Sequence, residues 1–321
     1  MVFTLDLTDR KILSELDKNA RTSYSELGKR IRVAKETVKY RVKRLQDEGI
    51  LQGFYTVVNL SKLGFVLHRL YLRLQNTSPI TEHEIENYLI NSKNVAVFYR
   101  INGEYNIVLG VWARTNWEYD EFWNSFKEKF GQYFAKYHLS IMTEYIEFSR
   151  LYLLNGSEDK TQFITITRTE KEKLDAIDFA LLAYLSNNAR ASLVDIAKKL
   201  RISIVTARYH LKKLCDKKVI VGFRPIFNLQ ALEREYYKVD IWFKKFDNVK
   251  KAAENILSNP NVVYTEKTLA TSDLEFDVEV ENFSKFIEMM DVFRETYPED
   301  IREYKYYSRV KHHKTSYIPE I

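Results

Sequence analysis

The sequence predicts an α+β protein in which one unit occurs twice: a winged or trihelical helix-turn-helix domain followed by a ferredoxin-like βαββαβ sandwich. Two observations predict this class. The chain matches itself when it is shifted by 169 residues, and in each copy the apolar period changes from helical to alternating. The matching stretches are Leu5-Asp6 with Leu174-Asp175, Asn19-Ala20-Arg21 with Asn188-Ala189-Arg190, Gly53-Phe54 with Gly222-Phe223, and Asn59-Leu60 with Asn228-Leu229.

Three helical patterns open each copy. In the first copy Asp6 can cap a helix with an apolar inner face, and Ser23 can cap a second one. A tight turn then leads into a third, basic helix that ends at Gly49, a residue suited to a left-handed position after a helix. Because the second and third helices are so close in sequence, the spacing is that of a helix-turn-helix. In the second copy Ser203 supplies the N-cap that Ala34 lacks, and a lysine replaces the terminal glycine.

The remainder of each copy follows strand and helix periods in turn. Residues 53–60 and 222–229 are predicted to be short strands, and Pro225 restricts the second to a sheet edge or a strand start. A βαββαβ order follows, which suggests four antiparallel strands with two helices on one face and leaves the other face in need of a partner. The expected elements are strand 68–75, helix 82–91, strands 95–101 and 105–112, helix 117–133 and strand 137–151, then strand 236–243, helix 249–257, strands 262–269 and 274–280, helix 283–297 and strand 302–311.

These elements predict four domains and one linker. The polar, turn-rich stretch from Asn155 to Thr161 indicates the linker. No apolar run approaches membrane-spanning length, and acidic residues stand near the N-terminus where a secretion signal would be apolar, so a cytoplasmic location without a membrane partner is expected. The expected boundaries are 1–53 and 170–222 for the helix-turn-helix domains, 54–154 and 223–321 for the α/β domains, and 155–169 for the linker.

Positive charge gathers in the two helix-turn-helix segments. The whole chain carries a formal net charge of +6 and has a pI near 9.0, values that fit many enzymes as well as nucleic-acid binders. The distribution discriminates better. Residues 29–44 hold eight basic residues and one acid, and residues 198–218 hold the same numbers. Basic patches on a helix that follows a helix-turn-helix turn are typical of DNA binding.

The combined pattern resembles the leucine-responsive regulator/AsnC (Lrp/AsnC) family of transcription regulators. The resemblance rests on "LDLTDRKIL" at 5–13, "NAR" at 19–21, "VAKETVKYRVKRLQDEGIL" at 33–51 and "INGEYNIVLGV" at 101–111. It implies a regulator that binds double-stranded DNA, with one helix-turn-helix and one α/β domain per copy. Members are typically dimers that associate through the sheets of the α/β domains. The duplication here therefore implies a fused pseudo-dimer, and further homo-oligomers are possible.

The third helix of each copy holds the residues expected to contact DNA. In the first copy Thr37, Lys39 and Tyr40 are expected in the major groove near the helix start, where Lys35 also stands. Cations further along the helix are expected on phosphates. The alternative is that these charges only solvate a small helical bundle. The expected phosphate contacts are Arg41, Lys43 and Arg44; the second-copy set is Ser203, Thr206, Arg208 and Tyr209, with His210, Lys212 and Lys213 for phosphates.

The second copy departs from the family pattern at its recognition helix. Ile204 and Val205 replace Lys35 and Glu36, and a histidine stands where the family usually has arginine. The two apolar side chains can contact thymine methyl groups or pack against protein, and the sequence leaves both readings open. The two halves are therefore expected to prefer different half-sites, which implies an asymmetric operator.

A possible amino-acid effector site is implied by the same resemblance, because family members often bind such effectors near a glycine-containing hairpin. The matching residues are Gly103, Glu104 and Tyr105. Asn-Gly between two alternating strands is also what a tight hairpin requires, whatever binds nearby. In the second copy Ser272 and Asp273 stand where glycine is expected, so at most one intact effector pocket is anticipated.

Two other functions remain as alternatives. Sirohaem decarboxylases are similar in layout, but they carry a histidine before the central hairpin, and neither "NVAVFYRING" at 94–103 nor "NVVYTEKTLATS" at 261–272 contains one. An architectural DNA binder without sequence preference would share the basic helices. No catalytic residue, metal site or cofactor is expected, because the histidines and carboxylates show no convincing spacing for either role.

Overall fold

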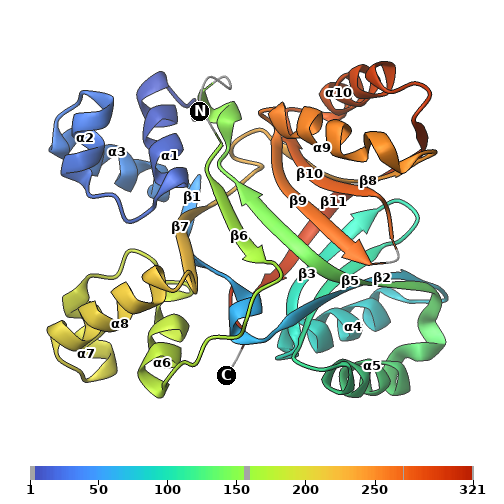
Figure 1. Ribbon diagram of the computed structural model, residues 1–321, viewed down its shortest axis with the longest axis horizontal. Coiled ribbons are helices and arrows are strands. Elements are labelled where there is room, and N and C mark those ends of the chain that lie inside the picture. The colour runs from blue at the N-terminus through green and yellow to red at the C-terminus, as the bar shows by residue number, and fades with distance from the viewer. Residues whose placement is uncertain (1–3, 155–159, 270, 320–321) are drawn as a thin grey trace.

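The computed structural model describes residues 4–154, 160–269 and 271–319, and it confirms the duplicated α+β order (Figure 1). The first copy consists of α1 (Leu7–Lys18), α2 (Tyr24–Ile31), α3 (Lys35–Asp47), β1 (Leu51–Val58), β2 (Val66–Leu74), α4 (Pro79–Asn91), β3 (Val95–Asn102), β4 (Ile107–Ala113), α5 (Asn116–Phe130) and β5 (Phe134–Phe148). After β6 (Gln162–Ile166), the second consists of α6 (Ala176–Leu185), α7 (Leu193–Leu200), α8 (Ile204–Asp216), β7 (Ile220–Phe227), β8 (Glu235–Phe243), α9 (Val249–Ser258), β9 (Val262–Leu269), β10 (Leu274–Val280), α10 (Phe283–Thr296) and β11 (Ile301–Thr315).

The two α/β sheets join at their edges and close into a ring of eight strands. The order is β2-β4-β3-β11-β8-β10-β9-β5, and β5 also pairs with β2. All of these pairings are antiparallel. The copies meet twice, where β3 pairs with β11 and where β5 pairs with β9. The expected need for a partner is met by edge pairing, which turns the helix-free faces of both sheets toward a shared interior.

Four helices cover the outside of this ring. Helices α4 and α5 lie over the first copy's strands, and α9 and α10 lie over the second copy's (Figure 1). Each pair encloses an apolar cluster with its own sheet, the first built around Phe98 and Phe126, the second around Phe276 and Phe286. Each α/β half therefore has a core of its own, as a ferredoxin-like sandwich requires.

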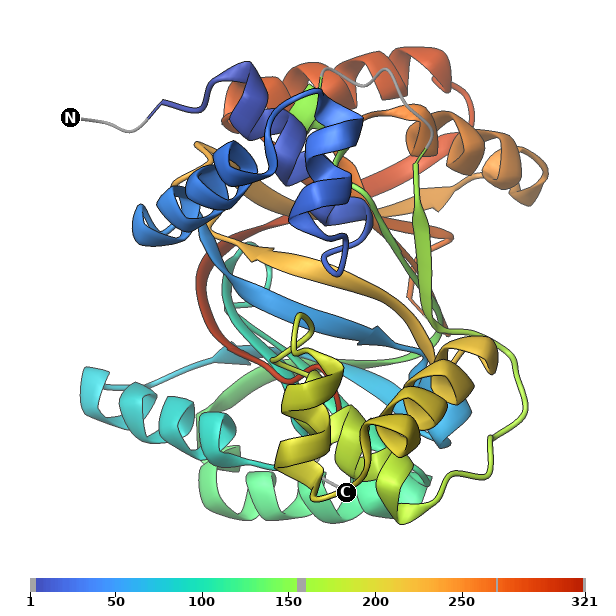
Figure 2. The same ribbon diagram turned by 90° about the vertical axis from the view of Figure 1, so that its left-hand side faces the viewer.

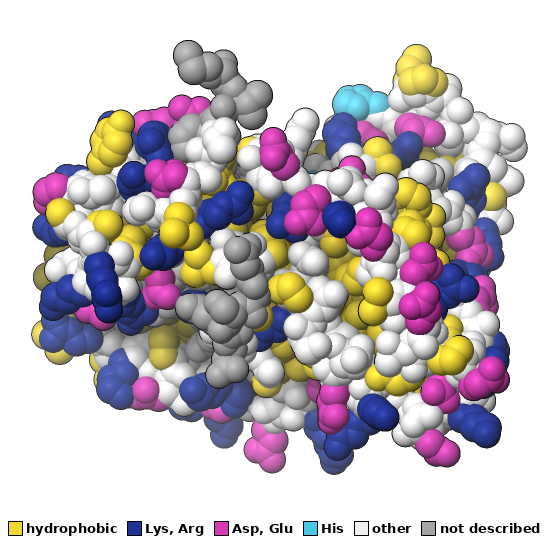
Figure 3. Space-filling model, turned by 90° about the horizontal axis from the view of Figure 1, so that it is seen from above, with side chains coloured by type: hydrophobic (Ala, Val, Ile, Leu, Met, Phe, Trp, Pro, Cys, Tyr) yellow, Lys and Arg dark blue, Asp and Glu magenta, His cyan; other side chains and the backbone are white. Residues whose placement is uncertain are grey.

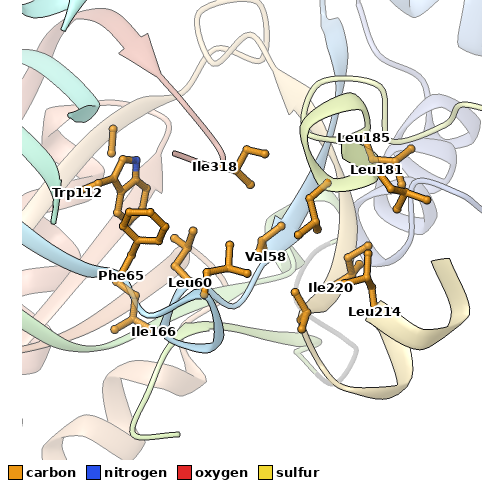
Figure 4. Close-up of a cluster of buried hydrophobic side chains, with 14 of the residues drawn as sticks. Val58, Leu60, Phe65, Trp112, Ile166, Leu181, Leu185, Leu214, Ile220 and Ile318 are labelled. Carbon is orange, nitrogen blue, oxygen red and sulfur yellow. The ribbon is translucent and has the colours of Figure 1, made fainter. Parts of the chain in front are cut away.

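The helix-turn-helix units pack on the opposite copy. Strands β1 and β7 pair antiparallel into a two-stranded ribbon between the units (Figure 2). Pro225 lies in this ribbon opposite Phe54, consistent with its predicted edge position. The first unit shares its core with Phe227 and Val263 of the second copy. The second unit shares its core with first-copy residues, among them Val58, Leu60, Phe65 and Trp112 (Figure 4).

The predicted linker is wrong in part. Residues 155–159 lie outside the described residues, but Gln162–Ile166 forms β6, which pairs with β5 at the edge of the sheet. The stretch alternates over its first four residues, so that Phe163 and Thr165 are buried while Gln162 and Ile164 are exposed. Burial of those side chains favours a strand at a place where polar composition alone had suggested a connection.

The predicted helix caps are confirmed. Asp6 accepts from the backbone of Asp9 in a reciprocal capping box, and the Ser203 side chain accepts from the backbone N–H of Thr206. Helix α3 begins at Lys35, and its N-cap residue, Ala34, makes no such side-chain bond in the described structure. Gly49 has φ +70°, and Lys218 adopts φ +56° at the equivalent place, so the second copy holds a lysine in the left-handed region.

Candidate nucleic-acid interface

Helix α3 presents one row of polar side chains to solvent. Val38, Val42 and Leu45 are buried, because they recur at the helical period on the inner face. The opposite face is exposed, and in the described ranges neither Lys39 nor Lys43 makes an ion pair. The exposed residues of this face are Lys35, Glu36, Thr37, Lys39, Tyr40 and Lys43.

Arg41 and Arg44 point back toward α1 instead. Arg41 Nη1 donates to Asp6 Oδ2 at 2.6 Å and to Asp9 Oδ1 at 2.9 Å, and Arg44 Nη2 donates to Asp9 Oδ2 at 2.8 Å. Asp9 is fully buried, so it depends on these cations for compensation. The prediction that both arginines serve phosphates needs correction: their guanidinium groups tie the recognition helix to the first helix of the bundle.

The second copy repeats this arrangement with different cations. His210 is buried, and its Nδ1 lies 2.8 Å from Asp178 Oδ1, while Lys213 Nζ donates to Asp178 Oδ2 at 2.5 Å and to Asp175 Oδ2 at 3.1 Å. The predicted phosphate role of His210 is therefore wrong, and that of Lys213 meets the same objection as Arg44. The ligand atoms of Asp175, Asp178 and His210 lie within 4.8 Å of one another, but Lys213 already neutralises this group as Arg44 does in the first copy.

Helix α8 carries an exposed row at the positions that match α3. Arg208 and Lys212 are exposed, and Lys212 pairs with Asp216 of its own helix at 2.5 Å and with no other carboxylate of the described residues. Ser203 acts as the N-cap, and Thr206 is half-buried beside it. At the start of the row stand Ile204 and Val205, which are exposed rather than packed against protein.

The Asn-Ala-Arg repeats hold the two helix-turn-helix units together, a role that sequence reasoning missed. Arg21 Nη1 donates to the carbonyl of Ala189 at 2.6 Å, and Arg190 Nη1 donates in return to the carbonyl of Ala20. The guanidinium of Arg21 also lies over the ring of Phe223. The exact recurrence of the tripeptide was a signal that both arginines serve one shared purpose, a reciprocal contact between the copies.

Both units lie on the same side of the molecule, above and below the β1–β7 ribbon (Figure 2). Seen from above, Lys and Arg side chains are numerous on the side of the first unit, with some Asp and Glu side chains among them (Figure 3). A surface rich in such cations attracts the phosphate backbone of nucleic acid.

The hairpin predicted to bind an effector is packed against the second copy. Gly103 has φ +147°, and a Cβ there would come 2.9 Å from Tyr307 Cδ1. Glu104 forms ion pairs with Lys136 and Lys305, which hold the pKa of its carboxyl below the ordinary value. The structure brings Gly103, Glu104 and Tyr105 together, with Tyr105 buried in the cluster that contains Tyr307. Close approach of strand β11 explains the glycine.

A cavity of about 240 Å³ lies inside the ring of strands and is lined by both copies. Arg309 faces it with its guanidinium 4.3 Å from the ring centroid of Tyr236. Among the described residues no carboxylate forms a salt bridge with this guanidinium, although the charge of Glu279 acts on it. Tyr236 donates to Asp277 Oδ2, while Asp277 Oδ1 is buried without a hydrogen-bond partner in the described part of the chain. Burial, and then the charge of Glu266, raise the pKa of Asp277 to about 7.

A buried ion network connects this cavity to the first helix-turn-helix unit. Asp17, at the end of α1, accepts from Arg150 Nη1 at 3.0 Å and from Arg224 Nη2 at 2.7 Å. Arg150 pairs in turn with Glu279, which lines the cavity. Burial opposes ionisation of Asp17, but the charges of Arg224 and Arg150 outweigh it and lower the pKa of this carboxyl. The network spans both copies.

Comparison with known proteins agrees with this geometry. A family model described as winged helix-turn-helix DNA-binding matches residues 5–52 and 174–221. The fold and the exposed recognition helices thus define a DNA-binding helix-turn-helix protein. The chain is 38% identical over 105 residues to an HTH-type transcriptional regulator of Pyrococcus furiosus, which covers 33% of this chain and 70% of that protein. It is 32% identical over 110 residues to the regulator LrpA of Pyrococcus horikoshii, covering 34% and 77%. This chain belongs to the Lrp/AsnC family of transcription regulators and carries the family's unit twice.

A solved structure matches almost the whole chain. The sirohaem decarboxylase NirDL superposes with a TM-score of 0.64, covering 97% of this chain and 94% of that one, at 11% identity. At this identity the likeness shows the shared duplicated fold alone. Within the described residues, none of the helices is both long and apolar enough to cross a membrane.

Proposed function

We propose that this regulator binds double-stranded DNA sequence-specifically as an intramolecular pseudo-dimer, with α3 and α8 as its two reading helices. The observation that carries the proposal is the reciprocal contact of Arg21 and Arg190, which fixes two exposed basic helices on one side of a single chain. Two recognition helices at a fixed spacing match a duplex with two half-sites.

The exposed cations divide into contacts for phosphates and contacts for bases. Lys43 in α3 and Lys212 in α8 stand toward the later turns, where a helix in the groove passes the backbone. Lys39, Tyr40, Arg208 and Tyr209 stand nearer the helix starts, where base edges are reached. We assign base contacts to the second set and phosphate contacts to the first.

Salt-dependent binding tests this proposal. The duplexes that the protein selects from a random library should be bound with an affinity that falls steeply with salt. Replacing Lys43 and Lys212 together by Ala should reduce the slope of log K against log salt by about two, because about one counterion is released per phosphate contact. Arg41→Ala is the matched control, since its guanidinium is engaged with Asp6 and Asp9. An unchanged slope in the double variant would reject the phosphate contacts.

The pseudo-dimer part has its own test. Arg21→Ala with Arg190→Ala removes the guanidinium hydrogen bonds between the units and leaves both reading helices and the β1–β7 ribbon intact. We expect the affinity for a duplex with both half-sites to fall toward that for one half-site. An architectural binder without sequence preference would select no common duplex from the library, which separates that alternative from the proposal.

We favour a regulator over a decarboxylase for this chain. Residues 94–103 and 261–272 contain no histidine. Sirohaem decarboxylases, by the resemblance described above, carry a histidine before the central hairpin. Both copies also keep exposed cations on their recognition helices. Spectroscopic titration with a sirohaem-type tetrapyrrole should show no binding.

We further propose that an amino-acid effector binds in the central cavity rather than at the Gly103 hairpin. Arg309 offers a guanidinium for a carboxylate, and Asp277 offers an oxygen without a described partner for an ammonium group; both residues contact Tyr236. The hairpin residues are occupied by contacts to β11. The test is thermal denaturation with each of the twenty amino acids, where Arg309→Gln should abolish any stabilisation and Glu104→Gln should not. Higher homo-oligomers and a cytoplasmic location stay predictions.

A further inference from the structure

The two reading helices differ most in their first turn. On α3 the exposed row begins with Lys35 and Glu36. The matched positions on α8 are Ile204 and Val205, and Val205 is 76% exposed. The rows then continue in parallel, Lys39 with Arg208 and Tyr40 with Tyr209. The two helices therefore present the same kind of surface to a partner except at the helix start. There α3 has a carboxylate where α8 has an isopropyl group.

Exposure decides between the two readings that the sequence left open for the second copy. Ile204 is 43% exposed and Val205 is more exposed still, so neither packs into the core of the unit. Tyr209, one turn later, is 61% exposed. Because the Val205 side chain is exposed, it contributes little buried apolar area to the stability of the free protein.

We propose that Val205 and Ile204 read thymine methyl groups, so that the half-site under α8 carries A·T pairs where the half-site under α3 carries a G·C pair. This rests on the proposed function. In the major groove only thymine presents a methyl group, and a carboxylate such as that of Glu36 accepts a hydrogen bond from the amino group of cytosine. Ser203 caps the helix and fixes the direction in which its first turn enters the groove.

The charged neighbours favour DNA over a protein as the partner of this apolar turn. Arg208 and Lys212 follow it on the same row, where Arg208 suits a base edge and Lys212 suits a phosphate. The helix start therefore carries two aliphatic groups beside two cations. This combination suits a base step with a methyl group and nearby phosphates better than it suits an apolar groove on a protein. A protein partner would instead leave DNA binding indifferent to the methyl groups.

Uracil substitution tests the proposal directly, because it removes the methyl group of thymine and keeps the hydrogen-bonding edge. In the best duplex selected by the full chain, each thymine is replaced in turn by uracil and the Kd is measured. We expect a loss of about fourfold for each methyl contacted by α8, corresponding to one buried methyl group. In the half-site of α3 the matched position carries a G·C pair, so uracil at the thymines of that half-site should have no such effect.

Exchange of the two side chains assigns the half-sites. Val205→Glu should abolish sensitivity to uracil and select cytosine at that position, while Glu36→Val should create sensitivity in the other half-site. Both residues are exposed, so neither change disturbs the core. Uracil-insensitive binding, or sensitivity that survives Val205→Glu, overturns this inference alone. Failure to select any common duplex overturns the proposed function together with it.

Discussion

The two helix-turn-helix units share a fold and a register, yet they are fastened to the molecule in different ways. The first is anchored by charge: Asp17 at the end of α1 meets Arg150 and Arg224 in a buried network. The equivalent residue of the second unit is Ser186, whose hydroxyl donates to Ala183 of its own helix. Both units share an apolar cluster with the opposite copy, the second with Val58 and the first with Val263, so the buried charged network is what distinguishes the first. A fused duplication allows such divergence, because each copy contacts the other copy of the same chain and does not have to be complementary to a copy identical to itself.

The largest expected effect comes from breaking the charged anchor. Asp17→Ala leaves two buried guanidinium groups short of a partner and should lower the free energy of unfolding by about 3–5 kcal/mol. Ser186→Ala, the matched change, should cost about 1 kcal/mol or less. Urea denaturation followed by circular dichroism measures both. Equal losses would show that the network does not distinguish the two units.

The same pair of variants has a pH signature. Neighbouring arginines lower the pKa of Asp17 from its ordinary 3.8, so the native state favours the ionised carboxyl. Its contribution to stability is present above that value and is lost as pH falls through the lower, folded pKa. The difference between the wild type and Asp17→Ala should therefore shrink in acid, whereas that of Ser186→Ala should stay constant.

The sequence predicted the two units and their helices and strands, but it did not predict the contacts that hold them in place. Local periodicity predicted the helices and strands, and the recurrence at 169 residues predicted the duplication. The cations of α3 showed no sign of their partners, because Asp9 and Arg44 meet only after the chain folds back over 35 residues. Edge pairing of β3 with β11, and of β5 with β9, joins segments from different copies and leaves no local trace. Basic residues on one helix were therefore assigned to DNA together, although the structure divides them into outward and inward sets.

A third prediction concerns the hairpins of the two α/β domains. Gly103→Ala places a Cβ 2.9 Å from Tyr307 Cδ1 at a backbone φ of +147°, so we expect a loss of about 1–3 kcal/mol in unfolding free energy. The equivalent residue in the second copy is Ser272, whose buried hydroxyl has no hydrogen-bond partner in the described structure. Ser272→Ala should therefore be neutral or slightly stabilising. Thermal denaturation of the two variants, side by side, measures this. A harmless Gly103→Ala would show that β11 can move away from the hairpin.

The smallest predicted effect can erase one difference between the reading helices. Ser203 caps α8 by accepting a hydrogen bond from the N–H of Thr206, while the N-cap residue of α3 is Ala34, which has no hydroxyl group. Ala34 is exposed and already has the extended backbone of a cap, φ −63° and ψ 144°, so Ala34→Ser needs no rearrangement. The new cap should stabilise the protein by about 1 kcal/mol, and Ser203→Ala should destabilise it by a similar amount. The double variant moves the cap from one helix to the other and should return the unfolding midpoint close to that of the wild type, since the sites are independent. A stabilisation by Ala34→Ser alone, without the matching loss in Ser203→Ala, would mean that the first turn of α8 is held by its surroundings rather than by its cap.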